Sequence, residues 1–295
     1  RENLAQLARL IDLAGETGIY LNITGLGSYE KDREPAWYRD MDEADRGAVH
    51  ARFWKAVAEV CAGEPSVLNY DLMNEPILKE GDEWLPGGGF GRMNFTQNIT
   101  RDLAGRTRAE IARAWVDQLV GAIREVDSET PVTVGVIPWV FHWGGGKPLF
   151  YGEAVRENLD FVSVHFYPRH GEVDKALEAL KAYDVGLPLV IEETVPLRCS
   201  MEDFAAFIEG SQAIADGWYG HYMGGDIAFY TEAARPTEEG RYRDWEYDDW
   251  VAWYEEQGDD IDEDLFEAIK ARGMRDWFTY FRETAPRMTG RDSAD

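Results

Sequence analysis

The feature that most constrains the fold of this chain is a repeated step in which an amphipathic helix is followed by a short strand. In the first step, apolar residues from Leu4 to Ala14 recur at helical spacing, and the β-type run IYLNI follows at 19–23. The strand candidates, which are apolar on both faces, lie at 19–23, 67–75, 131–139, 160–168, 187–194 and 226–232. Helices that alternate with such strands predict a parallel sheet covered by helices, as in α/β proteins.

The helices of these steps are recognised by their apolar spacing and by their first residues. Thr107 and Glu110 have the spacing of a capping box, and Ser200 and Asp203 have a similar spacing before a later helix. The segments with helical apolar spacing are 49–60, 111–123, around 177–180, 204–207 and 269–281. The alternation therefore continues through most of the chain.

The number of strand candidates favours a TIM (β/α)8 barrel from which the first two strands are missing, and these two strands are expected before Arg1. A doubly wound open sheet is the competing architecture, but it usually carries a glycine-rich phosphate turn after an early strand. The run GGGFG at 87–91 lies instead in a long loop. We therefore expect one barrel domain over 1–295, incomplete at its N-terminus, with an acidic, aromatic-containing insertion at 236–266 after the last strand.

The charge of the chain limits the partners that it can bind. There are 56 acidic residues against 30 Lys and Arg, which gives a formal net charge of −26. This charge argues against nucleic acid and against anionic membrane surfaces, and it favours neutral partners. Cys61 and Cys199 are the only cysteines, so a disulfide framework is not expected. Any signal peptide would precede Arg1, so the sequence leaves the localisation open.

Two strand candidates end in carboxylates. The segment YDLMNEP ends in Asn74 and Glu75 before Pro76, and VIEET carries Glu192 and Glu193. A carboxylate at the mouth of a core strand is costly unless it is used, and the ends of parallel barrel strands share one rim. Hydrolysis of a glycosidic bond requires two facing carboxyl groups, whose repulsion raises the pKa of the acid. The sequence therefore predicts a glycosidase.

Three segments, YDLMNEP, VSVHFYP and PLVIEET, resemble the fourth, sixth and seventh strand ends of family 5 glycoside hydrolases of clan A. The resemblance covers the chain from about Leu4 to about Glu232. It implies that Glu75 is the general acid/base and that Asn74 hydrogen-bonds the 2-hydroxyl of the sugar being cleaved. It also implies a nucleophile at Glu193.

The same resemblance implies that His165 and Tyr167 line the subsite of the sugar being cleaved, with Tyr167 close to the nucleophile. Strand side chains alternate, so only one of Glu192 and Glu193 can point into the barrel mouth. Related clan members have Thr after the nucleophile, which favours Glu193 because Thr194 follows it. Glu192 remains the alternative.

Aromatic residues in or beside the long loops after two strands are candidates for stacking on sugar rings, namely Trp84, Trp139 and Trp143. Family 5 members usually carry Trp at the eighth strand end. Here the expected strand DIAFYTE provides Phe229 or Tyr230 at that place. We select Tyr230 as the substrate-binding residue.

The two carboxylates alone fit either a retaining or an inverting mechanism. The resemblance implies a retaining glycosidase that cleaves β-linked neutral glycans of the glucan or mannan type and that needs no cofactor and no metal. An oligo- or polysaccharide is the expected partner. One alternative is a catalytically silent carbohydrate-binding barrel. Another is a metal-dependent barrel hydrolase that uses His142, His165 and His170, although their spacing matches no compact metal site. The exact glycan, endo or exo action and the oligomeric state are left open.

Overall fold

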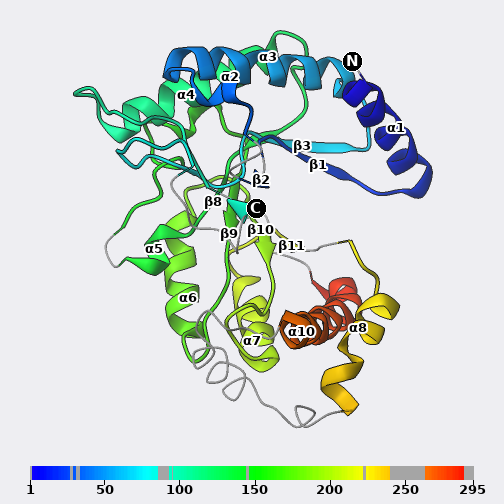
Figure 1. The fold of residues 1–295 in the computed structure, drawn as a ribbon. Coiled ribbons are helices and arrows are strands. Elements are labelled where there is room, and N and C mark those ends of the chain that lie inside the picture. Colours follow the sequence, from blue (N-terminus) through cyan, green and yellow to red (C-terminus); the bar gives the residue numbers. More distant parts are fainter. Residues whose placement is uncertain are drawn as a thin grey trace. The chain divides into compact units, whose positions relative to one another are not determined.

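The structure is a computed structural model that describes residues 2–26, 29–30, 34–85, 93–94, 96–143, 146–221, 224–239 and 263–288. The chain forms two compact units. Unit 1 comprises Arg1–Val164 and Ala182–Leu189, and unit 2 comprises His165–Lys181 and Val190–Asp295. The elements of each unit are labelled in Figure 1.

Unit 1 is organised around parallel strand pairs. Helix α1 (Glu2–Thr17) leads into β1 (Leu21–Thr24), which pairs in parallel with β3 (Val67–Asp71). Strand β3 pairs in parallel with β7 (Val132–Thr133). The α/β class with parallel pairing is therefore confirmed.

The second strand pair of unit 1 follows directly in the chain. Strand β8 (Gly135–Val136) pairs in parallel with β9 (Val162–His165) through Ser163 and Val164. All four residues of β9 are buried. Burial of consecutive residues on both faces is expected for strands of a parallel sheet that is covered by helices.

Helices α3 (Glu43–Cys61) and α4 (Arg108–Arg124) lie side by side in unit 1 (Figure 1). The capping box predicted before α4 is confirmed, because Thr107 accepts from the backbone of Glu110 and the Glu110 side chain accepts from the backbone of Thr107. The apolar positions expected in α4 are all buried: Ile111, Trp115, Leu119 and Ile123. Sequence periodicity thus identified the face that α4 presents to the core.

The connection after β3 contains short strands. Strand β4 (Pro76–Ile77) pairs in parallel with β6 (Gln97–Asn98), and β5 (Met93–Asn94) pairs antiparallel with β2 (Tyr29–Glu30). The short helices of unit 1 are α2 (Ala36–Arg39), α5 (Trp139–His142) and the 3-10 turn η2 (Arg156–Asn158). These pairings give part of the long loop a defined path.

Unit 2 contains the second predicted carboxylate strand, β10 (Leu189–Thr194). It pairs in parallel with β11 (Gly217–Gly220), and Val190 lies opposite Gly217. Helix α7 (Met201–Ser211) is capped by Ser200, which accepts from the Asp203 amide as expected. The other helical elements are α6 (Val173–Leu180), η3 (Lys181–Tyr183), α8 (Ile227–Glu239), α10 (Glu263–Thr284) and η4 (Ala285–Arg287).

The strand predicted at 226–232 is wrong, because these residues open helix α8. The Asp226 carboxylate accepts a hydrogen bond from the Phe229 amide at 2.7 Å, which is the geometry of a helix N-cap. Tyr230 is therefore not a strand-end residue. It is 6% exposed, and its ring packs against Phe278 with centroids 5.9 Å apart.

The cysteines are both buried and unpaired by disulfides, and Cys61 lies on the buried face of α3 as expected. Among the described residues, no helix has the length and apolar character needed to cross a membrane. The acidic insertion predicted at 236–266 falls largely outside the described residues, which end at Glu239 and resume at Glu263.

Candidate active site

Glu75 ends the segment 71–75, and Gly135 forms hydrogen bonds with both end residues of this segment, Asp71 and Glu75. The amide of Gly135, the first residue of β8, donates to Asp71 Oδ1 at 2.7 Å. The Gly135 carbonyl accepts from the amide of Glu75 at 2.9 Å. These two bonds tie the turn between β3 and β4 to the start of β8, and they satisfy the buried Asp71 carboxylate in part.

The backbone of Glu75 is strained. Its φ of +47° lies in the left-handed region, which residues other than glycine rarely adopt. Such a conformation costs on the order of 1–3 kcal/mol and persists only where the surrounding structure enforces it. Glu75 is 7% exposed, and Asn74 before it is partly buried. A buried, strained acidic residue that follows a core strand is a candidate functional residue.

Glu193 lies in β10 within a cluster of hydrogen-bond donors from unit 2. The Tyr167 hydroxyl donates to Glu193 Oε1, and Nδ1 of His221 lies 2.8 Å from the same oxygen. Nδ1 of His165 lies 3.3 Å from Oε2. The structure therefore brings together three residues selected from the sequence, Glu193, His165 and Tyr167, and adds His221.

Backbone pairing aligns the segments that carry this cluster. The amide of Phe166 donates to the Glu193 carbonyl at 2.9 Å, so the chain between His165 and Tyr167 runs beside β10. On the other side, the His221 amide donates to the Thr194 carbonyl at 3.0 Å and extends the β10–β11 pairing by one residue. Parallel strand ends thus deliver all four side chains to one place.

The surroundings of Glu193 keep its side chain ionised. Burial raises the pKa of this carboxyl, but a hydrogen bond from His221, the charges of His165 and His221 and the Tyr167 hydroxyl together lower the pKa to about 2. The side chain keeps 22% of its surface exposed. An ionised and accessible carboxylate can act as a nucleophile, whereas it cannot act as a general acid.

Glu192 has a different environment. It is 7% exposed, and its charge adds to the burial that raises the pKa of Tyr219 to about 12. The two adjacent glutamates are thus distinguished by their neighbours, as the alternation of side chains along a strand requires. Glu193 combines several donors with a side chain that is 22% exposed, as an attack on a ligand requires, whereas Glu192 is buried.

Trp139 and Trp143 form an aromatic surface in unit 1. Their rings stack at 4.7 Å with an interplanar angle of 9° at helix α5, and Trp143 is 64% exposed. A flat, exposed indole face is the surface on which a sugar ring stacks. Glu75, Asn74 and this aromatic pair belong to unit 1, whereas the Glu193 cluster belongs to unit 2.

Two aromatic residues selected from the sequence are packing residues in the structure. Trp84 is 4% exposed, and the guanidinium groups of Arg46 and Arg101 lie 4.3 and 4.6 Å from its ring centroid. The ring of Trp84 is thus covered by cations, unlike the exposed ring of Trp143. Tyr230 is buried in helix α8, so the strand-end position expected for Tyr230 is wrong.

Sequence analysis missed His221. The residue follows directly after GWYG, a segment whose glycines and half-exposed side chains do not resemble a core strand. Recognition of this strand would have identified His221, because a polar residue immediately after a parallel strand lies at the functional rim.

Three comparisons with known proteins bear on this site. A model of the cellulase family (glycosyl hydrolase family 5) matches residues 1–202. An endoglycoceramidase of Hydra vulgaris is 29% identical over 117 residues, which are 40% of this chain and 20% of that protein. The chain therefore matches one fifth of the length of this curated relative.

Solved structures share the fold at low identity. The catalytic domain of an endoglucanase from Thermobifida fusca is similar with a TM-score of 0.50 and 17% identity, over 76% of this chain and 63% of that one. An exo-β-1,4-mannosidase from an Opitutaceae bacterium, strain TAV5, is similar with a TM-score of 0.54 and 17% identity, over 74% and 40%. At this identity the likeness shows the α/β fold alone.

Proposed function

The chain belongs to glycosyl hydrolase family 5, the cellulase family, and from this premise we propose that it is a retaining β-glycosidase acting on β-linked neutral glycans of the glucan or mannan type. Glu193 is the nucleophile and Glu75 is the general acid/base. A TIM (β/α)8 barrel fold is part of the same proposal.

The observation that carries this proposal is the environment of Glu193. Among the described residues, Tyr167 and His221 lie against Oε1 and His165 lies against Oε2, so Oε2 is the oxygen with more capacity for attack. A pKa of about 2 keeps the carboxylate ionised at neutral pH. The same donors stabilise the carboxylate when it leaves in the second step.

The reaction proceeds by double displacement. Glu193 forms a bond to the anomeric carbon while Glu75 gives its proton to the glycosidic oxygen, and the C–O bond to the leaving sugar breaks. Glu75 then takes a proton from water, the water oxygen bonds to the anomeric carbon, and the ester bond to Glu193 breaks. The anomeric configuration is retained and both glutamates return to their first state.

The proposed substrate contacts follow from the chemistry of the remaining residues. Asn74 and His165 are suited to sugar hydroxyls, and the Trp139 and Trp143 pair is suited to the C–H face of a sugar ring. The similar proteins are named as an endoglucanase, a mannosidase and an endoglycoceramidase. The test panel should therefore contain β-glucans, β-mannans and glycosylceramides.

The test is hydrolysis of this panel, with the anomer of the first product followed by proton NMR. We expect the β anomer to appear first, and we expect Glu193→Gln and Glu75→Gln each to lower turnover by about 10³-fold or more. Activated 2-deoxy-2-fluoro glycosides should label Glu193, as detected by peptide mass spectrometry. Label on another residue, or near-normal turnover of either variant, would refute the assignment.

Two outcomes would favour the alternatives. Glycan binding without any product would indicate a silent carbohydrate-binding barrel. Loss of activity on dialysis against a chelator, with recovery on addition of a divalent metal, would indicate a metal-dependent hydrolase. The proposed two-glutamate mechanism predicts full activity after the same dialysis.

A further inference from the structure

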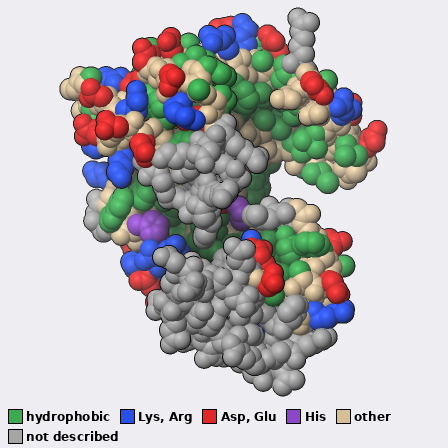
Figure 2. Space-filling model, viewed as in Figure 1, with side chains coloured by type: hydrophobic (Ala, Val, Ile, Leu, Met, Phe, Trp, Pro, Cys, Tyr) green, Lys and Arg blue, Asp and Glu red, His purple; other side chains and the backbone are tan. Residues whose placement is uncertain are grey.

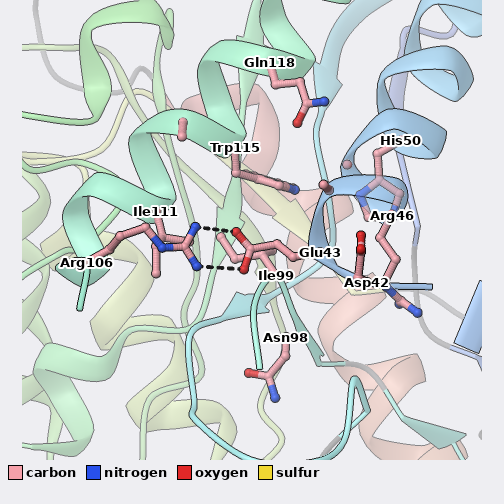
Figure 3. A pocket seen from close by; sticks show the side chains of 13 residues that line it. Asp42, Glu43, Arg46, His50, Asn98, Ile99, Arg106, Ile111, Trp115 and Gln118 are labelled. Carbon is pink, nitrogen blue, oxygen red and sulfur yellow. Dashed lines mark hydrogen bonds and ion pairs between the residues drawn. The ribbon is translucent and has the colours of Figure 1, made fainter. Parts of the chain in front are cut away.

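Unit 1 contains a pocket between helices α3 and α4, with a volume of about 440 Å³ (Figure 3). Its lining includes Glu43, His50, Arg106 and Trp115, and it includes neither Glu75 nor the aromatic pair at α5. All of its lining residues belong to unit 1. The pocket is therefore defined by residues other than those proposed for catalysis.

Two buried polar atoms at this pocket lack partners. Trp115 is 7% exposed and His50 is 4% exposed. Within the part of the chain that the structure describes, neither Nε1 of Trp115 nor Nδ1 of His50 has a hydrogen-bond partner. Figure 3 shows the Trp115 indole nitrogen directed toward the side of the pocket where His50 lies. A buried polar atom without a partner is costly, so each of these atoms favours a bound molecule that can satisfy it.

The two atoms define the kind of group that fits. The indole N–H of Trp115 can only donate. Nε2 of His50 is paired with the Tyr38 hydroxyl, so Nδ1 donates or accepts according to the tautomer. A hydroxyl group both donates and accepts, so hydroxyls satisfy Trp115 and either tautomer of His50.

Both arginines that line the pocket are paired with carboxylates. Arg106 holds Glu43 with two hydrogen bonds, at 2.6 and 2.9 Å, and the Thr100 hydroxyl donates to the same carboxylate. The hydrogen bond from Arg106 is the largest influence on the pKa of Glu43, which is lowered. Arg46 is paired with the buried Glu34 at 2.9 Å. This pairing, together with the net charge of −26, favours an uncharged ligand.

The rest of the lining is partly apolar. Ala44, Ile99, Ile111 and Ala114 contribute aliphatic surface beside the polar groups. A ligand that matches both surfaces carries hydroxyl groups on a ring with C–H faces. We propose that the α3–α4 pocket is a second carbohydrate site, which binds one neutral sugar unit through hydroxyls placed on Trp115 and His50.

The experiment follows the indole N–H signal of Trp115 in the full chain, labelled with ¹⁵N at tryptophan. Trp115→Phe assigns this signal by its disappearance. Titration with D-glucose and D-mannose should give a saturable shift of the Trp115 signal, at millimolar sugar, for at least one of them. Neither monosaccharide is hydrolysed, so the result is independent of the proposed function.

A matched pair of variants tests the position of the site. Ala114 lines the pocket on an exposed part of α4, so Ala114→Leu fills the pocket without disturbing the core. Gly121→Leu places the same side chain on an exposed position of α4 where no atom lies within 4 Å. We expect Ala114→Leu to weaken the response of Trp115 at least tenfold and Gly121→Leu to leave it unchanged.

Three results would overturn the proposal. The Trp115 signal could fail to respond to either sugar while showing transfer of magnetisation from water, which would mean that water alone fills the pocket. The Ala114→Leu variant could respond like the wild type, which would place the sugar elsewhere. Inorganic phosphate could give the same saturable shift, which would contradict an uncharged ligand.

Discussion

At the residue scale, Glu193 is stabilised as an anion by donors that come from both neighbouring segments of its strand. His165 is the last residue of β9, Tyr167 follows β9, and His221 follows β11. Because the pKa of Glu193 is lowered, the carboxylate stabilises the fold above its unfolded pKa near 4.5, and this contribution is lost as the pH falls from about 4.5 to about 2. His221 is therefore a positioning residue of the proposed nucleophile.

Substitution of His221 tests this role directly. His221→Phe removes the hydrogen bond and the charge, so the pKa of Glu193 should rise by at least one unit. His221→Asn can keep a donor near the position of Nδ1 without the charge, so it should give an intermediate pKa. The measurement is a ¹³C NMR titration of glutamate carboxyls, with the Glu193 signal assigned by its absence in Glu193→Gln.

His170→Asn is the matched control, because His170 lies 2.7 Å from Asp203 in the same unit and is not among the groups that shift Glu193. It should leave the pKa of Glu193 unchanged. An unaltered pKa in both His221 variants would show that His221 does not position the carboxylate. This titration requires no substrate, so it separates a failure of the positioning role from a failure of the proposed activity.

At the element scale, the packing of α10 on β11 depends on a glycine. A Cβ atom at Gly220 would lie 1.8 Å from the ring of Trp277, so only a residue without a side chain permits this approach. Trp277 is 5% exposed and stacks on Phe278 with centroids 4.6 Å apart. The position of β11, and hence of His221, is thus coupled to the closing helix.

We predict that Gly220→Ala destabilises the protein by about 1–3 kcal/mol, because overpacking forces Trp277 and its neighbours to move. Gly273→Ala is the matched control, since Gly273 lies within α10 and a Cβ there meets no atom within 4 Å. Alanine in that helix should stabilise by about 0.5–1 kcal/mol. Denaturant unfolding measures both changes, and equal effects of the two substitutions would contradict the packing described here.

At the scale of the whole molecule, net charge opposes folding. A formal charge of −26 implies repulsion among surface carboxylates, which favours expanded states. On the face of unit 1 seen in Figure 2, acidic and basic side chains are interspersed. Local pairs such as Arg113 with Glu157, at 2.6 Å, offset part of the repulsion but contribute little each.

Salt should therefore stabilise this protein. The screening length falls from about 30 Å at 0.01 M salt to about 3 Å at 1 M, so long-range repulsion is removed before buried pairs are affected. We expect the midpoint of thermal unfolding to rise by several degrees over this range, by about 2–4 °C for each kcal/mol gained. Sodium and potassium chloride should act alike. A falling midpoint would mean that attractive ion pairs outweigh the net repulsion.

Local sequence signals predicted much of the fold. The capping box at Thr107 and Glu110 and the apolar spacing through Leu119 depend on residues close in the chain, so both could be identified directly. The strand prediction at 226–232 failed because the aromatic and β-branched residues of this segment are typical of a strand, whereas the N-cap at Asp226 favours a helix. Local propensity was not sufficient where two local signals disagreed.

By itself the sequence determined the parallel α/β class, the helix boundaries marked by caps and the carboxylates at two strand ends. The tertiary structure decided which side chains surround Glu193, that His221 is one of them, and that Trp84 is covered by arginines. The physical reason is the separation along the chain between the residues that interact. Periodicity and capping act over a few residues, whereas a carboxylate's ionisation and a ring's exposure depend on groups that only folding brings near.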